Sequence, residues 1–368
     1  MFPLRGGDPQ LEQSLRGICS QEYPNMRVFL LLDSASDPAM DTIRQIQAEM
    51  PNAPIEVEVM EPVFDTCSLK CNSLIQKFRK LDPRYEIVAT LDGDVIPHPQ
   101  WVQEMVKPFY NTSVDFVTGY RWFVPTGSLG SLVRYTWNAA AWVHVHLNGI
   151  VWGGSFAIRR TAWERCRVGD YWQRSISDDI SSTESARRNH CKPVLVASNL
   201  MACREECSLW FAFRWCSRQM LMIRHATPTI WRRLCAMAGV LMLLHLASFF
   251  LIGGGIYTGN PELLNVSLAG LLLFWSGSFL FLPALEWLAR SCIRKHQSPI
   301  TWKWQIGFQL FFFIPLTILC FCVGMLYAMR TRIVSWRGIQ YQINPKQEVK
   351  RLNYAPYEAV KQSSKSVW

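Results

Sequence analysis

The sequence predicts an α/β fold, in which an open and mostly parallel sheet carries helices on both faces, followed by a helical membrane region. Two observations lead to this prediction. Up to residue 205, apolar stretches of strand length alternate with stretches of helical periodicity. Beyond residue 205 lie three apolar runs that each exceed the roughly 18 residues needed to cross a bilayer as a helix.

The elements of the first part follow from the apolar pattern. Unbroken apolar runs are expected for strands that are buried on both faces. The predicted strands are Met1–Leu4, Val28–Leu32, Ile55–Val59, Tyr85–Leu91, Phe116–Tyr120 and Val194–Ala197, and the predicted helices are Pro38–Met50 and Lys70–Leu81. In sheets of this kind ligands bind at the carboxyl ends of the strands, which is where Asp33 and Asp92 fall.

The second part is predicted to lie in a membrane. Its three apolar runs are Leu234–Tyr257, Leu263–Ala289 and Ile306–Met329. The preceding segment, 206–233, is rich in Trp, Phe, Met and Arg, which favours an amphipathic helix in the membrane interface, with an ordinary packing helix as the alternative. We therefore divide the chain into a globular domain (1–205), the interfacial segment (206–233), a transmembrane region (234–345) and a polar tail (346–368).

The charge distribution indicates which face of the membrane the globular domain occupies. The chain carries a formal net charge of +10, and basic residues such as Arg232, Arg233, Arg290 and Arg330 flank the apolar runs. Basic helix ends favour the cytoplasmic face and an anionic lipid surface. No basic helix or basic and aromatic motif indicates nucleic-acid binding, and the 12 cysteines lack the spacing of a zinc site. We expect an integral membrane protein whose globular domain is cytoplasmic.

One conflict in the predicted topology remains open at this stage. Three complete crossings that begin in the cytoplasm would place the basic segment Arg330–Arg337 outside, against the positive-inside tendency. Either one apolar run is re-entrant, at Pro283 or Pro315, or the tail returns by another route.

The motif Asp92-Gly93-Asp94 is the first candidate for chemistry. Two carboxylates at a strand end can hold Mg²⁺ or Mn²⁺, which would bridge to phosphate oxygens and neutralise charge on a departing diphosphate. Taken alone, an acid-Gly-acid turn is more often a solvated loop. The position at the end of a buried strand favours the metal site.

The motif Ser177-Asp178-Asp179 is the second candidate. Ser177 suits a helix N-cap, and acidic residues in the first turn are stabilised by the helix dipole, so a purely structural role is the simpler interpretation. The functional interpretation makes one carboxylate a general base that removes a proton from an acceptor hydroxyl.

Weaker candidates complete the set. Asp33 and Asp37 could contact a nucleoside or merely form a turn, and Lys70 could pair with phosphate as a point charge. Gly153-Gly154-Ser155 would allow close approach of a substrate to the backbone. His144 and His146 lack an acidic partner and are interpreted as packing residues.

Together these motifs resemble the inverting glycosyltransferases of family 2 with the GT-A fold, and in particular the ceramide glucosyltransferase-like branch. The resemblance runs from Arg5–Pro9 to the segment Trp336–Tyr341. It implies that Asp37 or Asp33, with Lys70, lies at the nucleotide. It further implies that Asp92 and Asp94 bind diphosphate and metal, and that Asp179 is the catalytic base, with Asp178 beside it.

The chain departs from the family at one motif. The family's Gln-x-x-Arg-Trp sequence, whose Arg and Trp close over the diphosphate and the acceptor, corresponds here to Trp215-Cys216-Ser217-Arg218-Gln219. Arg218 keeps the charge and Gln219 is placed at the donor, whereas a register on Arg214-Trp215 is the alternative. The altered motif argues against processive polymer synthesis.

The resemblance implies a membrane-bound transferase that moves a sugar, with glucose as the first candidate, from a UDP-sugar to the hydroxyl of a membrane lipid such as ceramide. Mg²⁺ or Mn²⁺ would be the cofactor. Two alternatives stay open: a processive synthase of a hyaluronan-, chitin- or cellulose-like polymer, and a non-catalytic membrane protein that binds nucleotide sugar or lipid.

Overall fold

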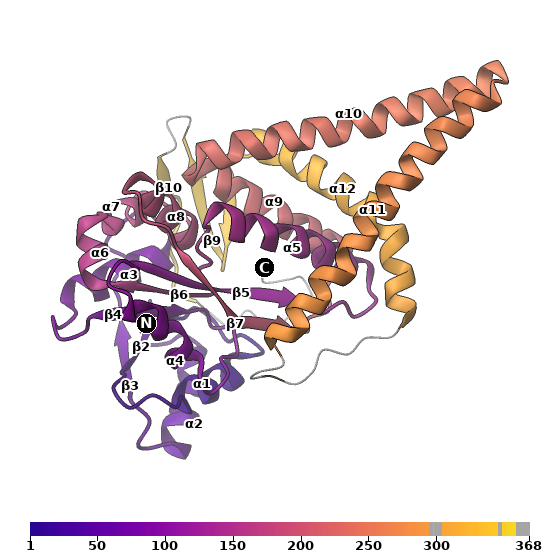
Figure 1. Ribbon diagram of the computed structural model, residues 1–368. Coiled ribbons are helices and arrows are strands. Elements are labelled where there is room, and N and C mark those ends of the chain that lie inside the picture. The colour runs from indigo at the N-terminus through magenta and orange to yellow at the C-terminus, as the bar shows by residue number, and fades with distance from the viewer. Residues whose placement is uncertain (294–296, 298–303, 345–347, 358–368) are drawn as a thin grey trace.

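The computed structural model describes the whole chain except residues 294–296, 298–303, 345–347 and 358–368, so most of the predicted polar tail lies outside the described residues. Its first sheet consists of three parallel strands in the order β1 (Phe2–Pro3), β2 (Val28–Leu32) and β3 (Ile55–Val59) (Figure 1). Every residue of β2 is buried, which explains its unbroken apolar sequence. The helices α1 (Leu11–Cys19) and α2 (Ala39–Glu49) make the crossovers and bury their apolar faces against it.

The second sheet has four strands in the order β4-β6-β5-β7. These strands are β4 (Ile87–Leu91), β5 (Phe116–Phe123), β6 (Ser155–Arg159) and β7 (Val194–Cys203). β6 runs antiparallel to β4 and to β5, whereas β5 and β7 are parallel. The amino group of Met1 donates to the carbonyl of Ala89, which joins β1 to β4 and makes one continuous layer. The predicted α/β fold with a mostly parallel sheet is confirmed, with β6 as an antiparallel strand that the sequence analysis did not predict.

Short helices surround the sheet, and two of them carry candidate site residues. Ser68 caps α3 by accepting from the backbone N–H of Cys71, and Ser177 caps α8 in the same way. The remaining helix of note, α5, was not predicted; it ends at Gly149, whose φ of 58° suits a helix terminus. The helices of this part are α3 (Leu69–Lys80), α4 (Trp101–Val106), the 3₁₀ turn η1 (Lys107–Tyr110), α5 (Leu129–Asn148), α6 (Arg160–Arg165), α7 (Val168–Trp172) and α8 (Asp178–Arg188).

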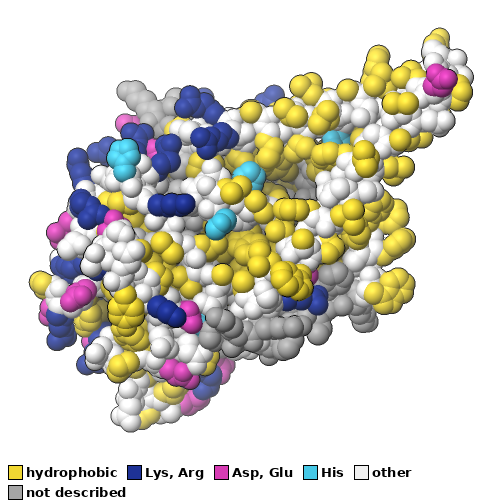
Figure 2. Space-filling view, in the orientation of Figure 1, with side chains coloured by type: hydrophobic (Ala, Val, Ile, Leu, Met, Phe, Trp, Pro, Cys, Tyr) yellow, Lys and Arg dark blue, Asp and Glu magenta, His cyan; other side chains and the backbone are white. Residues whose placement is uncertain are grey.

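Three helices of the described chain are long and apolar enough to cross a membrane, as expected: α10 (Pro228–Thr258), α11 (Pro261–Ile293) and α12 (Trp304–Arg330). α10 and α11 form a hairpin that projects far beyond the sheet domain (Figure 1). The visible side chains along the hairpin are mostly hydrophobic or uncharged, with an acidic one at its tip, whereas Lys and Arg gather over the sheet domain (Figure 2). Pro283 and Pro315 lie inside continuous helices, so neither apolar run is broken at its proline.

α12 differs from the two helices of the hairpin. Within its most apolar window 44% of the residues are buried, against 6% for α10 and 17% for α11. The difference arises because α12 packs along α9 (Leu209–Ala226) and α5. The predicted interfacial segment is therefore a helix that also packs, although Trp210 at its start is 65% exposed.

After α12 the chain returns to the sheet domain. Three antiparallel strands follow: β8 (Ile333–Trp336), β9 (Ile339–Ile343) and β10 (Val349–Arg351). The backbone N–H of Leu69 donates to the hydroxyl of Tyr341 over 3.2 Å, and the Arg351 guanidinium donates to the carbonyl of Pro62 over 2.7 Å. The start of α10 and the chain that follows α12 therefore both contact the sheet domain.

Candidate active site

The carboxyl end of β4 presents the two acids of the Asp92-Gly93-Asp94 motif to a cavity. Lys70 Nζ lies 2.7 Å from Asp92 Oδ1, and an Arg121 guanidinium nitrogen lies 3.1 Å from Asp94 Oδ2. Burial raises the pKa of Asp92 in spite of Lys70. Burial also opposes the ionisation of Asp94, but Arg121 and then Arg337 outweigh it and lower the pKa of that carboxyl. Asp94 is consequently the more firmly ionised of the two.

Lys70 joins this motif to the second one. Besides Asp92, its ammonium lies 2.9 Å from Asp178 Oδ1 and donates to the carbonyl of Gly153 over 3.2 Å. An ammonium has three N–H donors, and these three acceptors match them. In this arrangement Lys70 holds the end of β4 and the start of α8 together.

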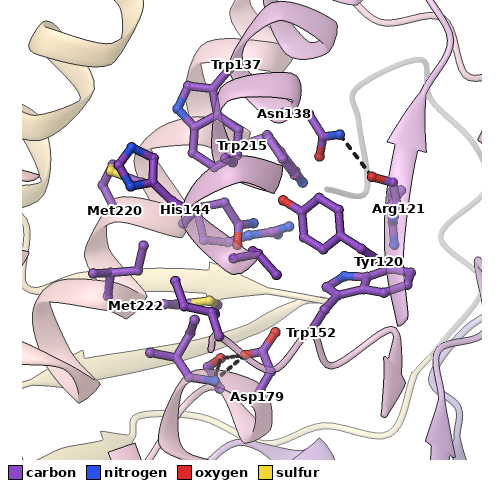
Figure 3. Close-up of a pocket in the computed structure, with 18 of the residues that line it drawn as sticks. Tyr120, Arg121, Trp137, Asn138, His144, Trp152, Asp179, Trp215, Met220 and Met222 are labelled. Atoms are coloured by element: carbon purple, nitrogen blue, oxygen red, sulfur yellow. Dashed lines mark hydrogen bonds between the residues drawn. The ribbon is translucent and has the colours of Figure 1, made fainter. Parts of the chain in front are cut away.

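The two acids at the start of α8 occupy different surroundings. Asp178 is fully buried, and burial, partly offset by Lys70, raises its pKa to about 7. Asp179 is half-buried and points into the cavity beside Trp152 (Figure 3). Its oxygens accept from the backbone N–H groups of Gly153 (2.9 Å) and Ile180 (2.7 Å). Asp179 is therefore the more accessible of the two acids.

Gly153 makes this placement possible. A Cβ atom at this position would lie 3.1 Å from the carboxylate oxygens of both Asp178 and Asp179. Without a side chain, the backbone before β6 can approach the first turn of α8 closely enough to donate to Asp179. The glycine pair that the sequence analysis assigned to close substrate approach thus first serves the approach of α8.

Asp33 and Asp37, the two residues predicted to contact the nucleoside, make different contacts in the structure. Asp33 lines the cavity and forms an ion pair with Arg5. Asp37 is buried, and its carboxylate accepts from the backbone N–H groups of Gly6 (2.9 Å) and Ala39 (2.8 Å). Asp37 therefore secures the loop after β1, and Asp33 is the one that faces the cavity.

Arg218 and Gln219 on α9 both line the cavity. Within the part of the chain that the structure describes, the buried Nε of Arg218 has no hydrogen-bond partner. Burial, followed by the nearby charge of Arg337, lowers the pKa of Arg218 to about 10, so the group remains charged near neutral pH. A cation in this position is poised to receive an anion from outside the protein.

Several lining residues were not predicted from the sequence. Arg121 projects from β5 and lies 5.2 Å from the ring centroid of Trp152. It is the lone cation in the apolar stretch Phe116–Phe123, which could have identified it. Trp137 of α5 packs edge-on against Trp215 of α9 at 5.0 Å (Figure 3). His144, interpreted as a packing residue, also lines the cavity.

The cavity has a volume of about 620 Å³ and two chemically different ends. One end is charged and lies over the carboxyl ends of β1, β2 and β4. The other is apolar and extends between the membrane helices. The charged end is lined by Arg5, Asp8, Asp33, Lys70, Asp92, Asp94, Arg121, Arg218 and Arg337, and the apolar end by Ile223, Leu234, Leu241, Phe281, Leu285, Ile314 and Phe321. Asp179 lies in the same cavity as both sets.

The acids at the charged end fit a divalent metal of the magnesium type. Among the described residues no group of three or more His, Cys, Asp or Glu side chains could hold a metal by itself. Mg²⁺, however, is typically bound by one or two carboxylates together with substrate phosphates. Asp92 Oδ1 and Asp94 Oδ2 each face a cation of the protein, and the second oxygen of each carboxylate could serve as a hard ligand in such a site.

Comparisons with known proteins identify the family. The mannosyltransferase PcManGT from Pyrobaculum calidifontis, solved with GDP-Man and Mn²⁺, is similar in structure with a TM-score of 0.48 and 16% identity, over 89% of this chain and 84% of that chain. Glucosyl-3-phosphoglycerate synthase from Mycobacterium tuberculosis has a TM-score of 0.36 and 16% identity, over 63% and 78% of the two chains. No curated protein matches significantly. The sequence model of glycosyl transferase family 21 matches residues 1–349. The expected glycosyltransferase is confirmed, with family 21 where the sequence analysis named family 2, and this chain belongs to glycosyl transferase family 21.

Proposed function

We propose that this protein transfers a sugar, with glucose as the first candidate, from a UDP-sugar to the hydroxyl group of a membrane lipid such as ceramide, with inversion at the anomeric carbon. The single observation that carries the proposal is the two-ended cavity. Its charged end suits a nucleoside diphosphate, and its apolar end, between the membrane helices, suits alkyl chains. A water-soluble acceptor has no alkyl chains that could occupy the apolar end.

The reaction is a single displacement for which the protein supplies a base and positive charge. Asp179 takes the proton from the acceptor hydroxyl, whose oxygen attacks the anomeric carbon as its bond to the diphosphate breaks. The backbone N–H groups of Gly153 and Ile180 hold the Asp179 carboxylate in place. Arg218, which lines the cavity, would pair with the departing diphosphate, and Lys70 would add its charge.

A divalent metal completes the donor end in this proposal. Asp92 and Asp94 would hold Mg²⁺ or Mn²⁺, which would act as a Lewis acid on the diphosphate leaving group. The firm ionisation of Asp94 beside Arg121 supports its part as a ligand. The nucleoside would lie toward Asp33, at the end of β2.

We further propose that the hairpin of α10 and α11 enters the membrane and returns, while α12 stays on the side of the catalytic domain. Arg233 near the start of α10 and Arg290 near the end of α11 then lie on one side of the bilayer, together with Arg330 at the end of α12. The tip around Gly259 carries no Lys or Arg. This distribution supports a cytoplasmic catalytic domain by the positive-inside tendency.

The test is to incubate the purified full chain in lipid vesicles with Mg²⁺, a panel of nucleotide sugars and ceramide, and to identify the lipid product by mass spectrometry. One added hexose per lipid is the expected product. A long polymer would instead favour a processive synthase, and nucleotide binding without any product would favour a non-catalytic binding protein.

A further inference from the structure

The turn between β8 and β9 has an unusual backbone. Trp336 pairs with Ile339, so the connection consists of Arg337 and Gly338 alone, with φ values of 49° and 79°. Two-residue hairpin turns of this kind favour Asn-Gly, because both central residues need a positive φ. An arginine is unfavourable at the first of these positions, and strained residues that persist are concentrated at functional sites.

The strained arginine reaches the charged end of the cavity. Its guanidinium lies 3.3 Å from Asp8 Oδ2 and donates to the carbonyl of Arg5 over 3.4 Å. In return, the Nε of Arg5 donates to the carbonyl of Arg337 over 3.0 Å. The turn is thus fastened to the loop that follows β1, and the Arg337 side chain lines the cavity.

Three guanidinium groups from distant parts of the chain meet at this end. Arg121 comes from β5, Arg218 from α9 and Arg337 from the turn after β8. The charges of Arg121 and Arg337 lower the pKa of Asp94 and also the pKa of Arg218. Asp94 pairs with Arg121 and Asp8 with Arg337, whereas the described chain provides no salt bridge for Arg218. Because the groups repel each other, an anion with several oxygens would stabilise the cluster.

The rest of the three-stranded sheet holds the turn in position. Tyr341 accepts from the backbone N–H of Leu69, the residue directly before Lys70. The backbone N–H of Arg351 donates to the carbonyl of Asp65 over 2.6 Å. The sheet is therefore anchored to the segment that leads into α3, and Trp336, Arg337 and Tyr341 of the sheet and its turn line the cavity.

We propose that Arg337 binds the diphosphate of the nucleotide-sugar donor, so that the segment after the membrane helices completes the donor site. The inference rests on the proposed function, because it takes the donor to be a nucleoside diphosphate sugar. Arginine suits this task, since its planar fork can donate two parallel hydrogen bonds to phosphate oxygens.

The competing explanation is that Arg337 only fastens the loop after β1 through Asp8. The test measures the affinity of the purified full chain for UDP and for GDP with Mg²⁺ by calorimetry, in the wild type and in Arg337→Ala, Arg337→Lys, Asp8→Asn and Arg332→Ala. Arg332 is exposed on the same segment and does not line the cavity, so its replacement controls for net charge.

We expect Arg337→Ala to weaken UDP binding about tenfold or more, Arg337→Lys to recover part of the loss, and Asp8→Asn to weaken binding clearly less than Arg337→Ala. Arg332→Ala should bind within about twofold of the wild type. Unchanged binding in Arg337→Ala would overturn the inference and leave the proposed function standing. An equal loss in Asp8→Asn would also overturn it, in favour of the fastening role. If the wild type binds neither nucleotide, the proposed function itself fails. If Arg337→Ala does not fold, the UDP affinity of Arg337→Lys tests the inference instead, because a lysine keeps the positive charge but cannot donate two parallel hydrogen bonds to the phosphate.

Discussion

Replacement of Asp179 by Asn tests the proposed base directly. The variant keeps the size of the side chain and one carbonyl oxygen, but it cannot take a proton from an acceptor hydroxyl. General-base catalysis typically contributes about 10²–10⁴ in rate, which corresponds to roughly 3–5 kcal/mol of activation free energy. We expect kcat to fall by about that factor.

The structural cost of the same replacement is smaller. Asp179 accepts from two backbone N–H groups, through Oδ2 from Gly153 and through Oδ1 from Ile180. An amide can keep only one of these hydrogen bonds, and its NH₂ group faces the other donor, so the free energy of unfolding should fall by about 1–3 kcal/mol. UDP affinity should change less than about threefold, because Asp179 makes none of the ion pairs at the diphosphate end.

The assay compares initial rates of lipid glycosylation at saturating donor and acceptor with UDP affinity and with the thermal midpoint. Ser177→Ala is the matched control, because it removes the N-cap hydroxyl that donates to Asp179 while it leaves the carboxylate in place. The N-cap loss alone costs about 1 kcal/mol of stability. If Asp179→Asn kept the full rate and the pH profile of the wild type, Asp179 would not be the base.

Three further outcomes are expected. Glu286 accepts from two buried donors, Trp122 Nε1 (3.0 Å) and Tyr135 Oη (2.9 Å), and Glu286→Leu leaves both without an acceptor. The free energy of unfolding, measured in detergent, should therefore fall by about 2–5 kcal/mol in Glu286→Leu and by less in Glu286→Gln. Equal losses in the two variants would contradict this. The pKa of Asp178 is raised from 3.8 to about 7, so the stability that its protonated form provides at low pH is lost as the pH rises through 7. Asp178→Asn should therefore flatten the dependence of the thermal midpoint on pH between about 4 and 7. An unaltered slope would refute the raised pKa of Asp178. A glycosylation acceptor sequence inserted at Gly259 should be glycosylated, because the tip of the hairpin is expected on the side of the membrane opposite to the catalytic domain. An inserted sequence that stays unmodified would contradict the proposed topology.

The sequence predicted the parts of the fold that depend on local pattern. Val28–Leu32 is buried on both faces, so its apolar run could only be a buried strand, and Ser177 capped a helix as its side-chain chemistry favours. α5 escaped prediction because it is covered on several sides by α9, α12 and β5, which removes a clear polar face. β6 escaped because the preceding Gly153-Gly154 indicated a turn.

The candidate site likewise contains residues that the sequence could predict and residues that it could not. Asp92, Asp94 and Asp179 stand next to recognisable element ends, and the structure brings them to one cavity. Arg337 could not be placed from the sequence, because its contact with Arg5 joins residues 332 positions apart. No local pattern determines a contact of that separation; it depends on where the last sheet folds back.

The return of the last three strands to the sheet domain also sets an order of assembly during synthesis. Residues that approach the donor end come from both extremes of the described chain, Arg5 before the membrane helices and Arg337 after them. Until α10, α11 and α12 have all left the ribosome, the turn that carries Arg337 does not exist. A nascent or prematurely terminated chain therefore holds the Asp92 and Asp94 carboxylates but lacks Arg337. If Arg337 binds the donor as proposed, full donor affinity would develop only after the membrane helices have been synthesised.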